Sequence, residues 1–308
     1  MVRGIKIFLK MRNTSHMRAV SLNILAKFTR TFVLSVVLVP LLFVESAKAD
    51  VAARIDVAGR QAMLSMRMAM TLCLVQSGAN ENYKYAAQQA IQIFDKSLNG
   101  LLHGKAFGID QPERNRPVLT SLNHVAEMWF QLGPDYWEMS VNRAPSEIIS
   151  EMIDENILLM QASNVALSEV EAVYGKDHPV PSSVPLLSQL REIRVHSQRA
   201  VKEACFAAQG FRATDMLASL GQTLQGMDAA MQSMQGALAK GGITEEAKAA
   251  ATTSFAKLTE MWSGMRSDLQ AIYEQGASTK SKLDELGQSA SNFLGESERL
   301  KSQLVPAS

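Results

Sequence analysis

Residues 51–77 read VAARIDVAGRQAMLSMRMAMTLCLVQS and decide the fold class. Apolar side chains recur in them at spacings near three and four residues, the period of an amphipathic helix: Val57, Leu64, Met68, Leu72 and Val75. The whole chain of 308 residues has nine prolines and 6% aromatic residues, with abundant Ala, Leu, Met, Gln and Glu. This composition favours helices over a β-sandwich. The sequence therefore predicts an all-α protein.

Turn and cap signals divide the rest of the chain into further helices. Gly133-Pro134 is expected to kink or break the third helix, Ser146 is expected to cap the fourth, and Thr244 is expected to cap the seventh. The segment 175–185 contains three prolines and two serines and is expected to be a linker. The predicted helices are 51–77, 83–103, 114–139, 145–174, 186–210, 213–239, 244–275 and 280–304.

The N-terminal segment has the features of an export signal. Residues 1–49 hold eight of the 31 basic residues and one of the 30 acidic ones, which leaves the remainder with a net charge of −6. Residues 31–44, TFVLSVVLVPLLFV, carry no charge but are shorter than the about 20 residues of a membrane span. Ala47-Lys48-Ala49 follows as a cleavage pattern. We expect a signal peptide over 1–49 and a periplasmic protein; the alternative is an uncleaved N-terminal membrane anchor.

The two halves of the remaining chain resemble each other. Ser65, Arg67 and Cys73 of the first correspond to Ser197, Arg199 and Cys205 of the second, and Glu127-Met128-Trp129 corresponds to Glu260-Met261-Trp262. Landmarks in the same order predict a duplication, because small changes of offset between them fall in loops. We therefore predict two tandem antiparallel four-helix bundles, over 50–174 and 186–308, on either side of the 175–185 linker.

Residues 54–69, RIDVAGRQAMLSMRMA, carry a family resemblance. They are similar to the first helix of the N-terminal sensory domain of type IV pili methyl-accepting chemotaxis transducers, the PilJ type, with the approximate pattern I-N-x-A-G-R-Q-R-M-L-S-Q-R-M-A. Asp56 replaces the usual Asn, Ala62 the central Arg and Met66 the Gln. A shorter, degenerate second copy begins at His196-Ser197-Gln198-Arg199.

The resemblance implies an all-helical sensory module outside the cytoplasm. The family is related to the periplasmic domains of nitrate and nitrite sensor kinases, in which a similar motif binds a small anion between the first helices of a dimer. Ala62 occupies the position of the arginine that binds the anion there. Arg67 matches a motif arginine, and Arg60 belongs to the pattern of the chemotaxis transducers.

The residue chemistry points independently to an anion. Arg60 and Arg67 are seven residues apart, hence on one face of a helix and about 10 Å apart along it. Guanidinium groups bind planar oxyanions with two hydrogen bonds. The candidate ligand-binding residues are Arg60, Gln61, Ser65, Arg67, Ser197 and Arg199. In the alternative interpretation these arginines pair with acids such as Asp56 or Glu203, or are solvated.

Other chemistry has less support in the sequence. Cys73 and Cys205 occupy equivalent positions and form either a disulfide, which export permits, or two buried small apolar residues. The methionines of 63–70 suit Cu(I) but equally fill a core. We expect no metal site, no cofactor and no enzymatic activity, because the sequence lacks the motifs of zinc proteases, covalent haem, di-iron sites, nucleophile elbows and phosphate loops. A third interpretation is a metal- or haem-binding bundle.

Together these features predict a sensor or ligand-binding protein. Capture of a small anion or other small molecule would change the packing of the two bundles. A membrane receptor, sensor kinase or pilus-linked protein would read that change, while nucleic acid is not an expected partner because the body of the chain is acidic. The competing hypothesis is a ligand-free periplasmic scaffold or protein-interaction module.

Overall fold

The computed structural model describes residues 29–175, 184–240 and 243–304, with the backbone alone for 29–49 and 184. Within these ranges it contains eight α-helices and no strand, so the all-α prediction is confirmed. The chain divides into two units, Met1–Ala47 and Lys48–Ser308. The first unit is helical from residue 29 onward. Most of the expected linker, 176–183, lies outside the described residues.

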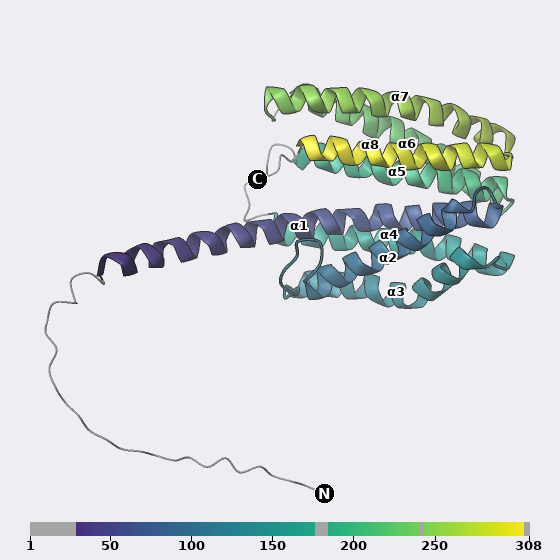
Figure 1. The fold of residues 1–308 in the computed structure, drawn as a ribbon. Coiled ribbons are helices and arrows are strands. Elements are labelled where there is room, and N and C mark those ends of the chain that lie inside the picture. Colours follow the sequence, from purple (N-terminus) through teal and green to yellow (C-terminus); the bar gives the residue numbers. More distant parts are fainter. Residues whose placement is uncertain (1–28, 176–183, 241–242, 305–308) are drawn as a thin grey trace, which may run out of the picture. The chain divides into compact units, whose positions relative to one another are not determined.

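The helices follow one another as antiparallel hairpins (Figure 1). Their bounds are α1 (Thr29–Ser77), α2 (Asn82–His103), α3 (Arg116–Val141), α4 (Ser146–Tyr174), α5 (Val184–Ala208), α6 (Ala213–Lys240), α7 (Glu245–Gln275) and α8 (Lys280–Leu304). We refer to residues 50–175 as the first half and to residues 184–304 as the second half.

Three expectations about helix ends are decided by the structure. Thr244 caps α7 as predicted, because its side chain accepts a hydrogen bond from the Ala247 N–H at 3.2 Å. The cap predicted at Ser146 is wrong: Pro145 occupies the N-cap position of α4, and no side chain caps it. Pro134 lies inside α3, which continues through it to Val141. The helix is therefore not broken there, although a proline removes one backbone hydrogen bond.

The main hydrophobic core of the second unit extends through both halves. In the first half Phe94 packs on Trp129, which packs edge-on against Tyr136, and Trp262 is buried in the second half. Contacts also cross between the halves: the Tyr83 hydroxyl donates to the Asp284 carbonyl at 2.9 Å. A Cβ on Gly287 would clash with that hydroxyl, so this approach requires glycine. The halves therefore pack against each other as well as within themselves.

Among the described residues, none of the helices combines the length and the apolar character that crossing a membrane requires.

Candidate functional site

The two helices that carry the motif, α1 and α5, run side by side and parallel. Cys73 and Cys205, which are 132 positions apart in the chain, form a disulfide with their Cα atoms 6.2 Å apart. Nearer the start of α1, a Cβ on Gly59 would lie 2.7 Å from Cδ of Arg191, its counterpart at the same offset. This is the repeat offset found in the sequence. Equivalent positions of the two halves thus face each other across the α1–α5 contact.

Local contacts recur at equivalent positions of the two halves. Gly78 and Gly210 both adopt positive φ and end their helices, with backbone N–H groups bonded to Val75 and Ala207. Positive φ at a helix end is readily adopted by glycine. Trp129 donates its indole N–H to Asp95 at 3.1 Å, and Trp262 donates to Asp228 at 2.9 Å. The two halves therefore use the same tryptophan anchor between their second and third helices.

Three of the candidate residues in α1 have partners within the protein. Arg60 forms an ion pair with Asp56, which also pairs with Lys301 of α8. Burial raises the pKa of Asp56, but these cations outweigh that effect and leave it lowered. Gln61 is buried and donates to Ser97 Oγ at 2.6 Å, while its Oε1 atom has no partner. Ser65 is fully buried and donates to the Ala62 carbonyl at 2.8 Å. The structure thus supports the alternative interpretation for Arg60.

Arg67 differs from the other motif arginines. Among the described residues, no carboxylate lies within ion-pair distance of its guanidinium and none of its N–H groups has a protein acceptor within hydrogen-bond distance. It is half-buried, and burial together with the nearby cation Arg194 lowers its pKa. A desolvated cation beside a second cation is unfavourable without an anion. Arg67 is therefore the motif residue best placed to bind one.

Arg194 of α5 is the neighbour that the sequence analysis missed. It is 4% exposed, forms an ion pair with Glu298 of α8, and leaves its Nε atom without a partner. Burial lowers its pKa, which Glu298 and Asp56 partly oppose. The sequence alone could have identified Arg194 as a candidate, because it is the counterpart of Ala62 at the repeat offset. The second half therefore has an arginine at the position where the first half lacks the central arginine of the motif.

Arg199 and Ser197 belong to a closed polar network in the second half. Arg199 donates to Glu203 Oε1 at 2.7 Å and to Ser219 Oγ at 2.9 Å. Glu203 is 1% exposed at its side chain and also accepts from Ser219 and Thr223. Ser197 donates to the Arg194 carbonyl at 2.9 Å. Since Glu203 satisfies Arg199, the structure does not leave these two residues open for a ligand.

A buried lysine lies next to this network. Lys202 is 1% exposed and donates to Asn156 Oδ1 at 3.4 Å, while Asn156 donates to the Ser65 carbonyl at 2.9 Å and to the Tyr136 hydroxyl at 3.2 Å. Burial lowers the pKa of Lys202 to about 8, which Glu203 opposes and Arg199 reinforces. The equivalent position in the first half is Met70, which is also buried.

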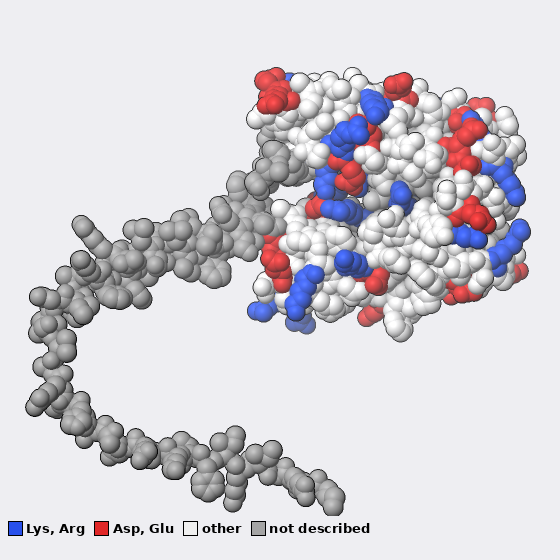
Figure 2. All heavy atoms as spheres, viewed as in Figure 1, with Lys and Arg blue, Asp and Glu red and all other residues white. Residues whose placement is uncertain are grey.

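The remaining sequence candidates have ordinary surroundings. Met63, Met66, Met68 and Met70 are buried, the first, third and fourth of them in the main core. Met66 packs with Ala62, Met160 and Val195 between α1, α4 and α5. No group of three or more His, Cys, Asp or Glu residues suited to a metal occurs in the part of the chain that the structure describes. Acidic and basic side chains are interspersed on the face shown in Figure 2.

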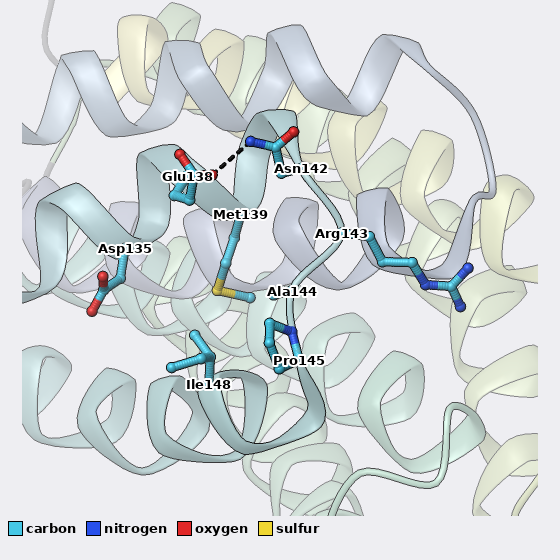
Figure 3. Close-up of a pocket in the computed structure, with 8 residues that line it drawn as sticks. All are labelled: Asp135, Glu138, Met139, Asn142, Arg143, Ala144, Pro145 and Ile148. Atoms are coloured by element: carbon cyan, nitrogen blue, oxygen red, sulfur yellow. Dashed lines mark hydrogen bonds between the residues drawn. The ribbon is translucent and has the colours of Figure 1, made fainter.

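A surface depression lies elsewhere, at the turn between α3 and α4 (Figure 3). Its volume is about 260 Å³, and none of the candidate motif residues lines it. Buried Gln76 of α1 holds this turn: its Nε2 donates to the carbonyls of Met139 at 2.7 Å and Asn142 at 2.9 Å, and its Oε1 accepts from the Ala144 N–H at 2.9 Å. The turn is thus fixed to the end of the motif helix.

The described part of the chain is thus an all-helical fold in which two arginine-bearing helices lie side by side. Comparison with family models identifies a family for part of the chain. Residues 44–145 match the model of the PilJ family, the type IV pili methyl-accepting chemotaxis transducer N-terminal domain. The match spans about a third of the chain and confirms the resemblance of the first half. Comparisons with curated proteins and with solved structures find no match.

Proposed function

We propose that the chain is a periplasmic sensory protein that binds a small oxyanion between α1 and α5, at Arg67 and Arg194. Residues 1–49 serve as its export signal, and 50–174 and 186–308 are two copies of one bundle. The contacts that recur at equivalent positions of the two halves support the duplication. The observation that carries the site is the half-buried guanidinium of Arg67, which has a cation beside it and, among the described residues, no carboxylate.

The helix pair supports a mechanism within one chain. In the related sensor kinases the anion lies between the first helices of two subunits, whereas here α1 and α5 of the same chain lie in parallel with matching register. An anion held by Arg67 of α1 and Arg194 of α5 would draw these helices together. A receptor, kinase or pilus-linked protein would then read the changed packing of the two halves.

Thermal unfolding of the full chain tests this proposal. Nitrate, nitrite, sulfate, phosphate and small carboxylates are each compared with chloride at equal ionic strength. A ligand at 100 times its Kd adds about 2.7 kcal/mol of stability, enough to raise the unfolding temperature by several degrees. Arg67→Gln and Arg194→Gln should abolish the rise. Arg212→Gln is the control, since Arg212 is bound to Asp154 and Asp215 on the surface.

Two results would contradict the site. One is an unfolding temperature that no oxyanion moves; the other is a rise that persists unchanged in Arg67→Gln. The first would favour the competing function, a protein-interaction module without a ligand, which the ion pairs Arg60–Asp56 and Arg199–Glu203 also support.

A further inference from the structure

The α3–α4 hairpin tip, which we define as residues 135–155, presents large apolar side chains to solvent. Trp137 is 40% exposed, Val141 42% and Ile148 36%. Exposed apolar groups that cluster, rather than being scattered singly, mark interaction surfaces. These three lie on two helix ends that Gln76 holds together, and Ile148 among them lines the depression at the tip. The tip is therefore a surface with a fixed shape.

The depression at the tip gives an apolar side chain a place to insert. Met139, Ala144, Pro145 and Ile148 line it together with polar residues. Figure 3 shows Met139 and Ile148 directed toward each other between the two helices, while Asp135 lies at one edge and Arg143 points away. Its volume of about 260 Å³ exceeds that of any single side chain. One bulky apolar group, with part of its neighbour, would fit.

Negative charge predominates around the depression. The hairpin tip contains six carboxylates and a single cation, Arg143. Within the described part of the chain, only Asp154 of the six forms an ion pair, with Arg212. Partial burial and the neighbouring Glu151 and Asp135 raise the pKa of Glu155. Glu155, Glu151 and Asp135 are therefore close enough to repel one another, and among the described residues none of these three forms an ion pair.

We propose that the hairpin tip docks a basic amphipathic segment of a partner protein. An apolar side chain of that segment enters the depression, and its lysines or arginines lie against Asp135, Glu151 and Glu155. A basic segment fits because complementary charge relieves the repulsion among the acids and steers association. An amphipathic helix supplies both features on one face. This proposal is independent of the anion site, which lies on other residues of α1 and on α5.

Binding of a designed probe tests the proposal. The probe is a fluorescein-labelled helical peptide of five turns with leucine on one face and lysine on the other, measured by fluorescence anisotropy with the full chain. The triple variant Asp135→Asn/Glu151→Gln/Glu155→Gln should weaken binding about tenfold or more, which is about 1.4 kcal/mol. The matched control removes three exposed acids of α7: Glu246→Gln/Glu260→Gln/Glu274→Gln.

The apolar part of the proposal has its own controls. Ile148→Ser should weaken binding, whereas Leu158→Ser, on the same helix and 53% exposed, should leave it unchanged. A peptide with serine in place of leucine should bind poorly. Equal losses in the two triple variants, or equal binding of the serine and leucine peptides, would reduce the interaction to general attraction by an acidic protein and overturn the proposal. Absence of binding to the wild-type chain would also overturn it.

Discussion

The two halves of the helical unit share their framework but differ where a ligand or partner could act. Both place a tryptophan on an aspartate of the preceding helix, and both end their first helix with a glycine at positive φ. When the two tryptophans are aligned, the exposed Phe130 and Trp137 of α3 correspond to Ser263 and Gln270 of α7. In the same alignment Asp135 corresponds to Asp268, which is paired with Lys282 at 2.8 Å. Contacts shared by the two halves thus support their framework, and the differing ones mark candidate surfaces.

The motif arginines show the same division. Arg67 and Arg199 occupy equivalent positions, yet Arg199 neutralises the buried Glu203 and Arg67 has no such partner among the described residues. Equivalent positions therefore have different surroundings in the two halves. Substitutions made in parallel in the two halves test this contrast.

The largest expected difference is between Arg199→Met and Arg67→Met. Arg199→Met leaves the carboxylate of Glu203 buried without its cation, which should lower the free energy of unfolding by about 3–5 kcal/mol. Arg67→Met removes a poorly solvated cation that has no carboxylate partner among the described residues, and should leave stability equal or higher. Urea unfolding at low anion concentration measures both. Equal destabilisation by the two variants would contradict the distinction between the arginines.

The next difference concerns Lys202 and its equivalent, Met70. In the unfolded chain a lysine has a pKa of about 10.4, whereas burial lowers the folded pKa of Lys202 to about 8. Between these values the unfolded state binds the extra proton, so stability should rise with pH from about 8 toward 10. Lys202→Met should raise stability at pH 7 by about 3 kcal/mol and remove that part of the rise.

Urea unfolding at several pH values, with wild type and Lys202→Met side by side, measures this prediction. Asn156→Ala provides a control, because it removes the acceptor of Lys202 and leaves the lysine in place. The pH dependence should then persist. The prediction would be contradicted if the free energy of unfolding of the wild type falls between pH 8 and 10. It would also be contradicted if Lys202→Met leaves the pH dependence unchanged.

Helix periodicity and turn residues were enough to predict eight helices and their order, but the first helix begins at Thr29 rather than at residue 51. Ser146 was mistaken for a cap because Pro145 and Ser146 both suit a helix start, and the sequence does not determine which one begins it. The partner of Arg199 could be named in advance, since Glu203 lies one turn further along the same helix face. The neighbours of Arg67 could not be named in advance, because Arg194 comes close to Arg67 only through the packing of α5 on α1. Gln76 was missed for the same reason: its partners lie 63 to 68 residues further along the chain, at the end of α3 and in the turn that follows it.

The smallest expected difference separates the two tryptophan anchors. Asp95→Asn and Asp228→Asn each keep an oxygen that accepts the indole N–H, so neither should cost more than about 1 kcal/mol. Asp228 additionally pairs with Arg266 at 2.8 Å, a half-exposed contact that is worth about 0–1 kcal/mol. Asp228→Asn should therefore cost slightly more, and the excess should vanish in an Arg266→Gln background. If Asp95→Asn costs several times more than Asp228→Asn, the anchors contribute unequally, and their recurrence at equivalent positions would no longer support a shared framework.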